Sequence, residues 1–337
     1  MDFDRWNVTR FGADPSGKQD STERINQAIA QSAEMGGGTI YIPAGVYLID
    51  PDRSIILMNG TRIMGDGDGA TVLHALPRAG SVFRRSYDRT KKNEYVSDIH
   101  LSHLSVVMEH PEGCSYEQIA FDFRHITRST IEECYAGNYG RGRLKKHPED
   151  MGGMARGYGV AFGNTSSSFI SYCGGEVNSL VRSTVWGAKK AVVLDAQELC
   201  EPNGVSSAHA TVVQGCDIQI CESGIVQEGK YTAGCVFRDN IVQCVVKPAD
   251  ERMKSYFYRI EGYANQLYNS YIEDQSRQAD YILQLGEASR GNMVEMGYFE
   301  SDHALIEDLG VNNVVGYFEL DHGSYIKQVN GVRIGAL

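Results

Sequence analysis

The chain has 337 residues, of which 42% are hydrophobic and 22% are charged, so it can bury a large core and is no disordered tail. Its formal net charge of −11 argues against a general affinity for the phosphate backbone of nucleic acids. No run of about 18 apolar residues occurs, so the sequence predicts no transmembrane helix.

The N-terminus and the cysteines both bear on the compartment in which the protein works. The first residues, MDFDRWNVTRFG, lack the apolar stretch of a secretory signal, so we expect no signal peptide. The eight cysteines form no CxxC motif or other zinc-ligand spacing and are typical of small buried hydrophobic residues. These features favour a reducing, cytoplasmic location, and the sequence predicts no metal site and no cofactor.

An amphipathic helix is predicted close to the N-terminus. Asp20 is followed three places on by Glu23, which matches a helix N-cap with a carboxylate in the first turn. Apolar residues then recur at helical spacing from Ile25 to Ala33. The glycines at 36–38 suit the left-handed geometry of a helix C-terminus, so we expect the helix to end there.

Strands dominate the rest of the chain. Residues 39–49, TIYIPAGVYLI, indicate two short strands broken by a Pro-Ala-Gly turn, and hardly any helical pattern follows. A coil of strands leaves unpaired backbone groups at its first turn, and the early helix would cover that edge. We therefore expect a cap with the first strands over residues 1–50 and one continuous domain over residues 51–337.

Two segments, FGADPSGKQDSTERINQAIA and GGGTIYIPAGVYLI, resemble the N-terminal signature of the pectate-lyase-like superfamily, which includes polygalacturonases, tailspike depolymerases and fructan-acting transferases. The resemblance implies an all-β fold, a right-handed single-stranded parallel β-helix with an N-terminal capping α-helix. It also implies a carbohydrate substrate, assembly as a homotrimer and, for a tailspike-like protein, association with a phage virion. The signature is a cap and carries no chemistry.

The chain departs from the best-known members of this family. The Asn-Thr-Asp, Asp-Asp, Gly-His-Gly and Arg-Ile-Lys motifs of polygalacturonases are absent, and the calcium site of pectate lyases has no clear match. The polygalacturonase activity is therefore not carried over. The alternative fold is a β-sandwich or barrel, which also has many short strands.

Several repeats support a solenoid. The residues from Ile99 to Val106 alternate as one strand with a single buried face would. The pairs Gly215-Cys216 and Gly234-Cys235 recur at a spacing of about one rung.

The C-terminal third repeats more plainly, with similar tyrosine-containing segments at 271–273, 297–300 and 316–319. Asparagines precede them, and we expect these to stack at one turn position and to bond the backbone of the next rung. The predicted ladder consists of Asn240, Asn269, Asn292 and Asn312 or Asn313. Outward-facing tyrosines on these segments would suit a contact between subunits.

Residues 137–158 interrupt the repeat with a long, glycine-rich and locally basic segment. Because arginine pairs bidentately with carboxylates and sulfates, one interpretation is that it holds an acidic glycan. The alternative is a solvated loop with scattered charge. The predicted substrate-binding residues are Arg141, Arg143, Lys145 and Arg156, with Lys230 and Arg238 beyond the loop.

Cleavage of a polysaccharide requires one of two sets of residues. Glycoside hydrolysis needs two carboxylates, and carboxylates one rung apart, about 4.8 Å, suit retention better than those two rungs apart. Elimination from a uronic acid needs a base and a group that neutralises the substrate carboxylate. The predicted catalytic candidates are Asp195, Glu222, Glu228, His147 and Tyr158, with Glu198 and Asp239 as further carboxylates. The alternative interpretation is that each of these residues is a surface charge. For Asp239 the alternative is a structural role in a turn.

Three functions follow from these patterns. The first is a carbohydrate-active enzyme, hydrolase or lyase, with its groove on the side of the β-helix. The second is a non-catalytic glycan-binding or structural fibre protein. The third is a transferase or isomerase acting on a small cytosolic substrate.

Overall fold

The computed structural model describes residues 5–86, 95–109, 115–138, 155–164, 176–197, 208–248, 250–301, 304–319, 324–329 and 332–336. The side chains of residues 155–164 and 317–336 lie outside this description. Within the described ranges no helix has the length and apolar character that crossing a bilayer requires.

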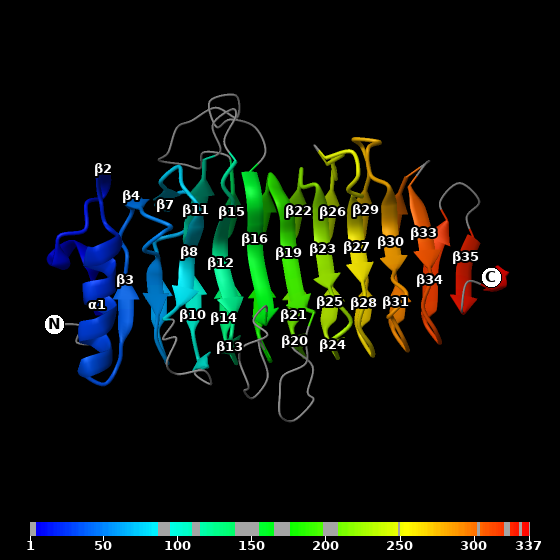
Figure 1. The fold of residues 1–337 in the computed structure, drawn as a ribbon, viewed down its shortest axis with the longest axis horizontal. Helices are drawn as coiled ribbons and strands as arrows, with labels where there is room; N and C mark the ends of the chain where they lie inside the picture. Colours follow the sequence, from blue (N-terminus) through cyan, green and yellow to red (C-terminus); the bar gives the residue numbers. More distant parts are fainter. Residues whose placement is uncertain are drawn as a thin grey trace.

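The strands form three long sheets that run side by side along one axis (Figure 1). Sheet A has 13 strands in the described part of the chain: β1 (Arg5–Asn7), β3 (Thr39–Tyr41), β6 (Arg62–Met64), β10 (His100–Ser102), β14 (Thr130–Glu132), β17 (Ser179–Val181), β21 (Val212–Gln214), β25 (Val236–Arg238), β28 (Gln266–Tyr268), β31 (Met293–Glu295), β34 (Val314–Glu319), β35 (Ser324–Val329) and β36 (Val332–Ala336).

Sheet B has 10 strands over the same ranges: β2 (Ser16–Asp20), β4 (Gly45–Ile49), β7 (Thr71–Ala75), β11 (Ser105–Met108), β15 (Tyr135–Gly137), β18 (Thr184–Trp186), β22 (Asp217–Gln219), β26 (Ile241–Gln243), β29 (Tyr271–Glu273) and β32 (Tyr298–Glu300). Sheet C has 9 strands there: β5 (Ile55–Leu57), β8 (Gly80–Arg85), β12 (Gln118–Arg124), β16 (Ala155–Asn164), β19 (Ala188–Ala196), β23 (Ser223–Glu228), β27 (Tyr256–Ile260), β30 (Tyr281–Leu285) and β33 (Leu305–Asp308). Two short pairs stand at the corners: β9 (Val96–Ser97) with β13 (Ile126–Thr127), and β20 (Ala208–His209) with β24 (Thr232–Ala233).

Successive strands of each sheet pair in parallel, so that the chain coils as a right-handed parallel β-helix and the prediction of this fold is confirmed. A β-sandwich or up-and-down barrel would require antiparallel neighbours, so that alternative is excluded. The last two strands differ, because β34, β35 and β36 pair antiparallel to one another.

The helix α1 (Thr22–Glu34) lies at the N-terminal end of the coil (Figure 1) and contacts β1, β3 and β5. A single turn of 3-10 helix, η1 (Val8–Phe11), precedes it. Ile25 and Ile29 are buried on its inner face, as their spacing predicts, so the expected cap is confirmed. Its N-cap residue is Ser21 rather than Asp20, whose side chain instead accepts a hydrogen bond from the Thr22 N–H at 2.9 Å.

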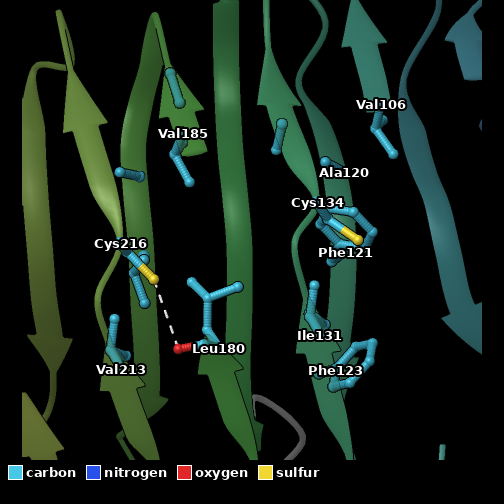
Figure 2. Packing of buried hydrophobic residues seen from close by; sticks show 14 of the residues in the cluster. Val106, Ala120, Phe121, Phe123, Ile131, Cys134, Leu180, Val185, Val213 and Cys216 are labelled. Carbon is cyan, nitrogen blue, oxygen red and sulfur yellow. Dashed lines mark hydrogen bonds between the residues drawn. The ribbon is translucent and has the colours of Figure 1, made fainter. Parts of the chain in front are cut away.

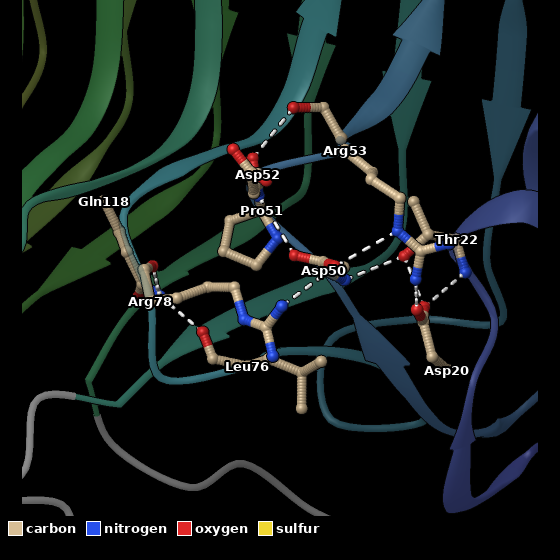
Figure 3. Close-up of polar contacts among 10 residues, drawn as sticks. Asp20, Thr22, Asp50, Pro51, Asp52, Arg53, Leu76, Arg78 and Gln118 are labelled. Carbon is tan, nitrogen blue, oxygen red and sulfur yellow. Dashed lines mark hydrogen bonds and ion pairs between the residues drawn. The ribbon is translucent and has the colours of Figure 1, made fainter.

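A polar network ties this helix to the first full coil (Figure 3). The Asp50 carboxylate accepts from Arg53 Nε at 3.1 Å and from Arg78 Nη1 at 3.2 Å. Arg53 also pairs with Asp20, and the Asp50 N–H donates to Thr22 Oγ1 at 2.7 Å. The backbone and the buried carboxylate of Asp50, together with Arg53, therefore link the start of α1 to the ends of β2 and β4.

The core fills the inside of the coil with like residues stacked rung upon rung (Figure 2). Phe83 and Phe121 are registered neighbours whose rings stack 5.4 Å apart. Cys216 occupies a similar interior position, where its thiol donates to the Leu180 carbonyl at 3.5 Å and burial raises its pKa to about 12. The described cysteines that are buried, as predicted, are Cys134, Cys216, Cys221 and Cys235.

Two predictions about the strands are wrong at the corners of the coil. The residues from Ile99 to Val106 are not one strand, because His103 adopts a φ of 57° and turns the chain from β10 into β11. The Gly-Cys pairs are not equivalent positions either. Cys216 follows β21 and Cys235 precedes β25, and β21 and β25 are themselves one rung apart.

An asparagine ladder exists, but its membership differs from the prediction. Asn265, Asn292 and Asn313 stack at the corner that precedes sheet A, and all three are buried. Asn292 Oδ1 accepts from the Asn265 N–H at 2.8 Å, and Asn313 Oδ1 accepts from the Asn292 N–H at 3.0 Å. Asn240 and Asn269 lie at the corner between sheets A and B instead, so their place in this ladder was predicted wrongly.

The predicted tyrosine repeat is confirmed for two of its three segments. Tyr271 and Tyr298 are registered neighbours in sheet B, and their rings stack 4.7 Å apart. Tyr317 lies in β34 of sheet A and pairs antiparallel with Ile326, so the third segment is not a further step of the same column.

Candidate active site

Sheet C carries a set of charged side chains on its outer face. Asp195 lies between Leu194 and Ala196 on β19, and both of these neighbours belong to the hydrophobic core. Because side chains alternate along a strand, the Asp195 carboxylate lies on the outer face of the sheet. Only 7% of the residue is nevertheless exposed.

Asp195 has a second carboxylate as its neighbour on the next rung. Glu228 on β23 is its registered partner, which places the two α-carbons about one strand spacing apart, roughly 4.8 Å. The Glu228 carboxylate forms an ion pair with Lys190, which stands on the same strand as Asp195. Both side chains of that ion pair are largely buried, at 16% and 23% exposure. The site therefore combines two adjacent carboxylates with one cation.

A second cation faces Asp195 from the other side. Arg124 on β12 is in register with Gly163, which is in register with Asp195. A glycine at this position places no side chain between the guanidinium and the carboxylate. Arg124 is held by Asp122, with Nε–Oδ1 and Nη2–Oδ2 distances of 2.7 and 2.6 Å. Such a bidentate pair fixes the orientation of the guanidinium.

The surroundings of Asp195 raise its pKa to about 6. Burial is the largest cause, and the neighbouring charge of Glu228 adds to it, while Arg124 and Lys190 act in the opposite direction. Within the described part of the chain its buried Oδ1 has no hydrogen-bond donor, so little stabilises the charged form. A carboxyl group with this pKa can donate or accept a proton near neutral pH, as general acid–base catalysis requires.

The raised pKa predicts how stability depends on pH. The unfolded chain loses the Asp195 proton near pH 4, whereas the folded chain holds it until about pH 6. Ionisation of this group therefore lowers the free energy of unfolding as the pH rises through this window. We expect Asp195→Asn to gain stability relative to the unmodified chain between about pH 4 and pH 7. Urea unfolding at both pH values measures this difference, and an unchanged difference would contradict the assignment.

An open pocket of about 910 Å³ continues from Glu228 toward the C-terminal end of the same face. Its lining includes Lys230, Tyr256, Arg259 and Glu261, which come from β23, β27 and the segments that follow them. Glu228 lines this pocket, and Asp195 is its registered neighbour on the preceding rung, so these two carboxylates, here called the acid pair, stand beside the pocket.

The structure separates the predicted site residues into three groups. Asp195 and Glu228 come together, and Lys230 lines the adjoining pocket. Glu222 lies at the opposite end of β23 from Glu228, about 20 Å away along the strand, so the two cannot act as a pair. Arg238 ends β25 of sheet A, on another face, where it donates to Gln214 at 2.8 Å.

The remaining predictions are structural or lie outside the described residues. Asp239 occupies a turn with a φ of 56° and accepts from the Asn269 side chain, as its turn chemistry predicts. Tyr158 is in register with Lys190, but its side chain and that of Arg156 lie outside the description. The predicted residues wholly outside the described ranges are Arg141, Arg143, Lys145, His147 and Glu198.

Sequence reasoning missed the residues that surround the acid pair. Lys190, Asp122 and Arg124 were not among the candidates, although each stands in or beside an apolar run of a strand. Asp122 within QIAFDFR and Asp195 within AVVLDA carry the same signal, a charge inside a run of residues that fill a core. That signal could have directed attention to β12 as well as to β19.

Comparisons with known proteins agree with this fold. Residues 5–137 match the family model described as Rhamnogalacturonase A/epimerase, pectate lyase-like. Over 73 residues, 20% of the chain, it is 38% identical to alginate lyase 7 of Azotobacter vinelandii, and over 48 residues, 14% of the chain, 48% identical to alpha-1,3-galactosidase A of Peterkaempfera griseoplana. The matches span only 8% and 7% of these relatives.

Among solved structures, the enzymatically active domain of tailspike protein 2 from bacteriophage CBA120 superimposes with a TM-score of 0.62 at 12% identity. This match covers 95% of the chain and 44% of that structure. The likeness shows the fold, and with the family model it confirms the resemblance to the pectate-lyase-like superfamily.

Proposed function

Because the chain has the pectate-lyase-like β-helix fold, we propose that it is a carbohydrate-active enzyme that cleaves a glycan on the outer face of sheet C. The observation that carries this proposal is the registered pair Asp195 and Glu228, in which one carboxyl group has a raised pKa. Two carboxylates with different environments, placed beside an open pocket, form the acid–base set of glycoside hydrolysis.

The two carboxylates would have different roles. Asp195, which holds a proton up to about pH 6, would donate it to the oxygen of the departing sugar. Glu228, paired with Lys190, would face the positive charge that develops at the anomeric carbon. A separation of one rung is close to the roughly 5 Å of retaining enzymes, so we infer hydrolysis with retention.

A polysaccharide lyase is the second candidate. One of the relatives is named as an alginate lyase, and the register places Tyr158 beside Lys190 on the strand next to Asp195. A tyrosine or lysine can serve as the base of an elimination, and Arg124 could neutralise the substrate carboxylate. Hydrolysis is favoured because Glu228 lines the pocket and Asp195 is its registered neighbour.

A panel of neutral and acidic polysaccharides tests both reactions at once. Hydrolysis releases reducing ends alone, whereas elimination also produces an unsaturated uronate that absorbs at about 235 nm. We expect reducing ends without this absorbance for the unmodified chain and neither signal for Asp195→Asn. Bound polymer with no product from the unmodified chain would identify a non-catalytic glycan-binding protein instead.

Our proposals about the oligomeric state and the location of the protein depend on the same resemblance. The solved β-helix that superimposes here is a phage tailspike domain, and we infer that this chain likewise works on a glycan as part of, or beside, a phage particle. A homotrimer and the division into a cap over residues 1–50 and a β-helix over residues 51–337 remain predictions.

A further inference from the structure

The pocket beside the acid pair has a lining that bears on the class of sugar it accepts. Its charged residues are three carboxylates, Glu228, Glu261 and Glu287, and two cations, Lys230 and Arg259. Glu228 is paired with Lys190, which lies outside the lining, so the pocket carries no net charge once that partner is counted. The amides of Gln197 and Gln284 and the ring of Tyr256 also line the pocket.

Two of these five charges, those of Arg259 and Glu261, are engaged with each other. Arg259 Nη2 lies 2.5 Å from the Glu261 carboxylate, and its guanidinium carbon is 5.5 Å from the centre of the Tyr256 ring. The Gln284 amide donates to Glu307 at 2.7 Å. Lys230 and Glu287 form no ion pair among the described residues, and both are exposed. The pocket thus offers one unpaired cation, which an unpaired carboxylate offsets.

Gly286 shapes the floor of this pocket. A methyl group at this position would lie 2.1 Å from Glu261 Oε1, so a larger residue would displace that carboxylate. Glycine therefore leaves Glu261 room to stand in the pocket as a hydrogen-bond acceptor. Carboxylates and amides that accept from hydroxyl groups, next to an aromatic ring, are suited to uncharged sugars.

We propose that this pocket binds neutral, hydroxyl-bearing sugar units, and that the substrate is an uncharged glycan rather than a uronate polymer. The proposal rests on the proposed function, because it concerns the same pocket. A uronate polymer would bring a negative charge on every unit to a lining without net positive charge, in which Lys230 is the one cation that forms no ion pair among the described residues.

The test uses the full chain with Asp195→Asn, so that binding is measured without cleavage. The probes are labelled dextran, galactan and mannan as neutral polymers, and alginate and polygalacturonate as acidic ones, each at low and high salt. We expect binding by at least one neutral polymer, changed less than about twofold by salt, because no charge on the ligand is screened. Gly286→Ala in the same background should weaken that binding by about tenfold.

A charge reversal supplies the matched comparison. Glu287→Lys should allow the pocket to bind an acidic polymer, whereas Glu295→Lys, an exposed site on β31 of sheet A, should not. Salt-sensitive binding of alginate or polygalacturonate to the chain with only Asp195→Asn would overturn the proposal, and so would binding of no polymer. Cleavage by the unmodified chain is measured separately. A result that contradicts the neutral-sugar proposal is therefore distinguished from one that contradicts the proposed enzymatic function.

Discussion

Replacing Asp195 with asparagine is expected to lower kcat by about 10³-fold, the usual effect of removing a positioned general acid. The side chain keeps its size and its place between Leu194 and Ala196, so the fold should be retained. The variant cannot donate a proton to the leaving oxygen, and it no longer adds negative charge beside Glu228. The measurement is kcat of the unmodified chain and of Asp195→Asn on the polymer that is cleaved in the panel. The thermal unfolding midpoint of both chains checks that the fold is retained.

Glu222→Gln is the matched control for that experiment. Glu222 is also a carboxylate of the β23 region, but it precedes the strand, whereas Glu228 ends it. Its replacement should change kcat by less than about twofold, since it lies about 20 Å from the acid pair. An equal loss in both variants, or full activity in Asp195→Asn, would show that the reacting carboxylates lie elsewhere.

Replacing Asn292 with alanine is expected to lower the free energy of unfolding by about 3 kcal/mol. The side chain is buried and joins three rungs, accepting from Asn265 and donating to the Gly262 carbonyl at 2.9 Å and to Asn313 at 3.0 Å. Its loss leaves buried donors and acceptors unpaired, and each such group costs about 1–3 kcal/mol.

Asn59→Ala provides the comparison for the ladder. Asn59 also accepts one backbone hydrogen bond, from the Ser97 N–H at 2.8 Å, but it is exposed and water can replace it. We expect a loss below about 1 kcal/mol there. Urea unfolding of both variants measures the difference, and similar losses would mean that the ladder does not contribute through burial.

The cap was predictable because its signals are local. A helical period, a glycine stop and two strands follow one another within one stretch of chain, and α1 forms where that pattern places it. The corners were less predictable, because several depend on residues such as Arg128 and Ile220 that adopt positive φ with no intrinsic preference for it. Strands of three residues are also too short for alternation to reveal where one ends.

The candidate site was also only partly predictable from the sequence. Both carboxylates were among the sequence candidates, but so were Glu222 and Asp239, and only the register separates them. Register depends on how many residues each coil contains, and that number changes from coil to coil with the loops at the corners. Arg124 reaches Asp195 through such register alone, so its role could not be read from spacing.

Side chains around Asp195 alternate between the interior and the outer face of sheet C, and this affects how a β-helix protein can acquire new reactions. The residues on either side of it fill the interior, while Asp195 itself faces outward, so a substitution there alters reactivity and leaves the packed interior untouched. Other positions of sheet C whose side chains face outward have the same freedom. New specificities can therefore arise one residue at a time on an unchanged scaffold.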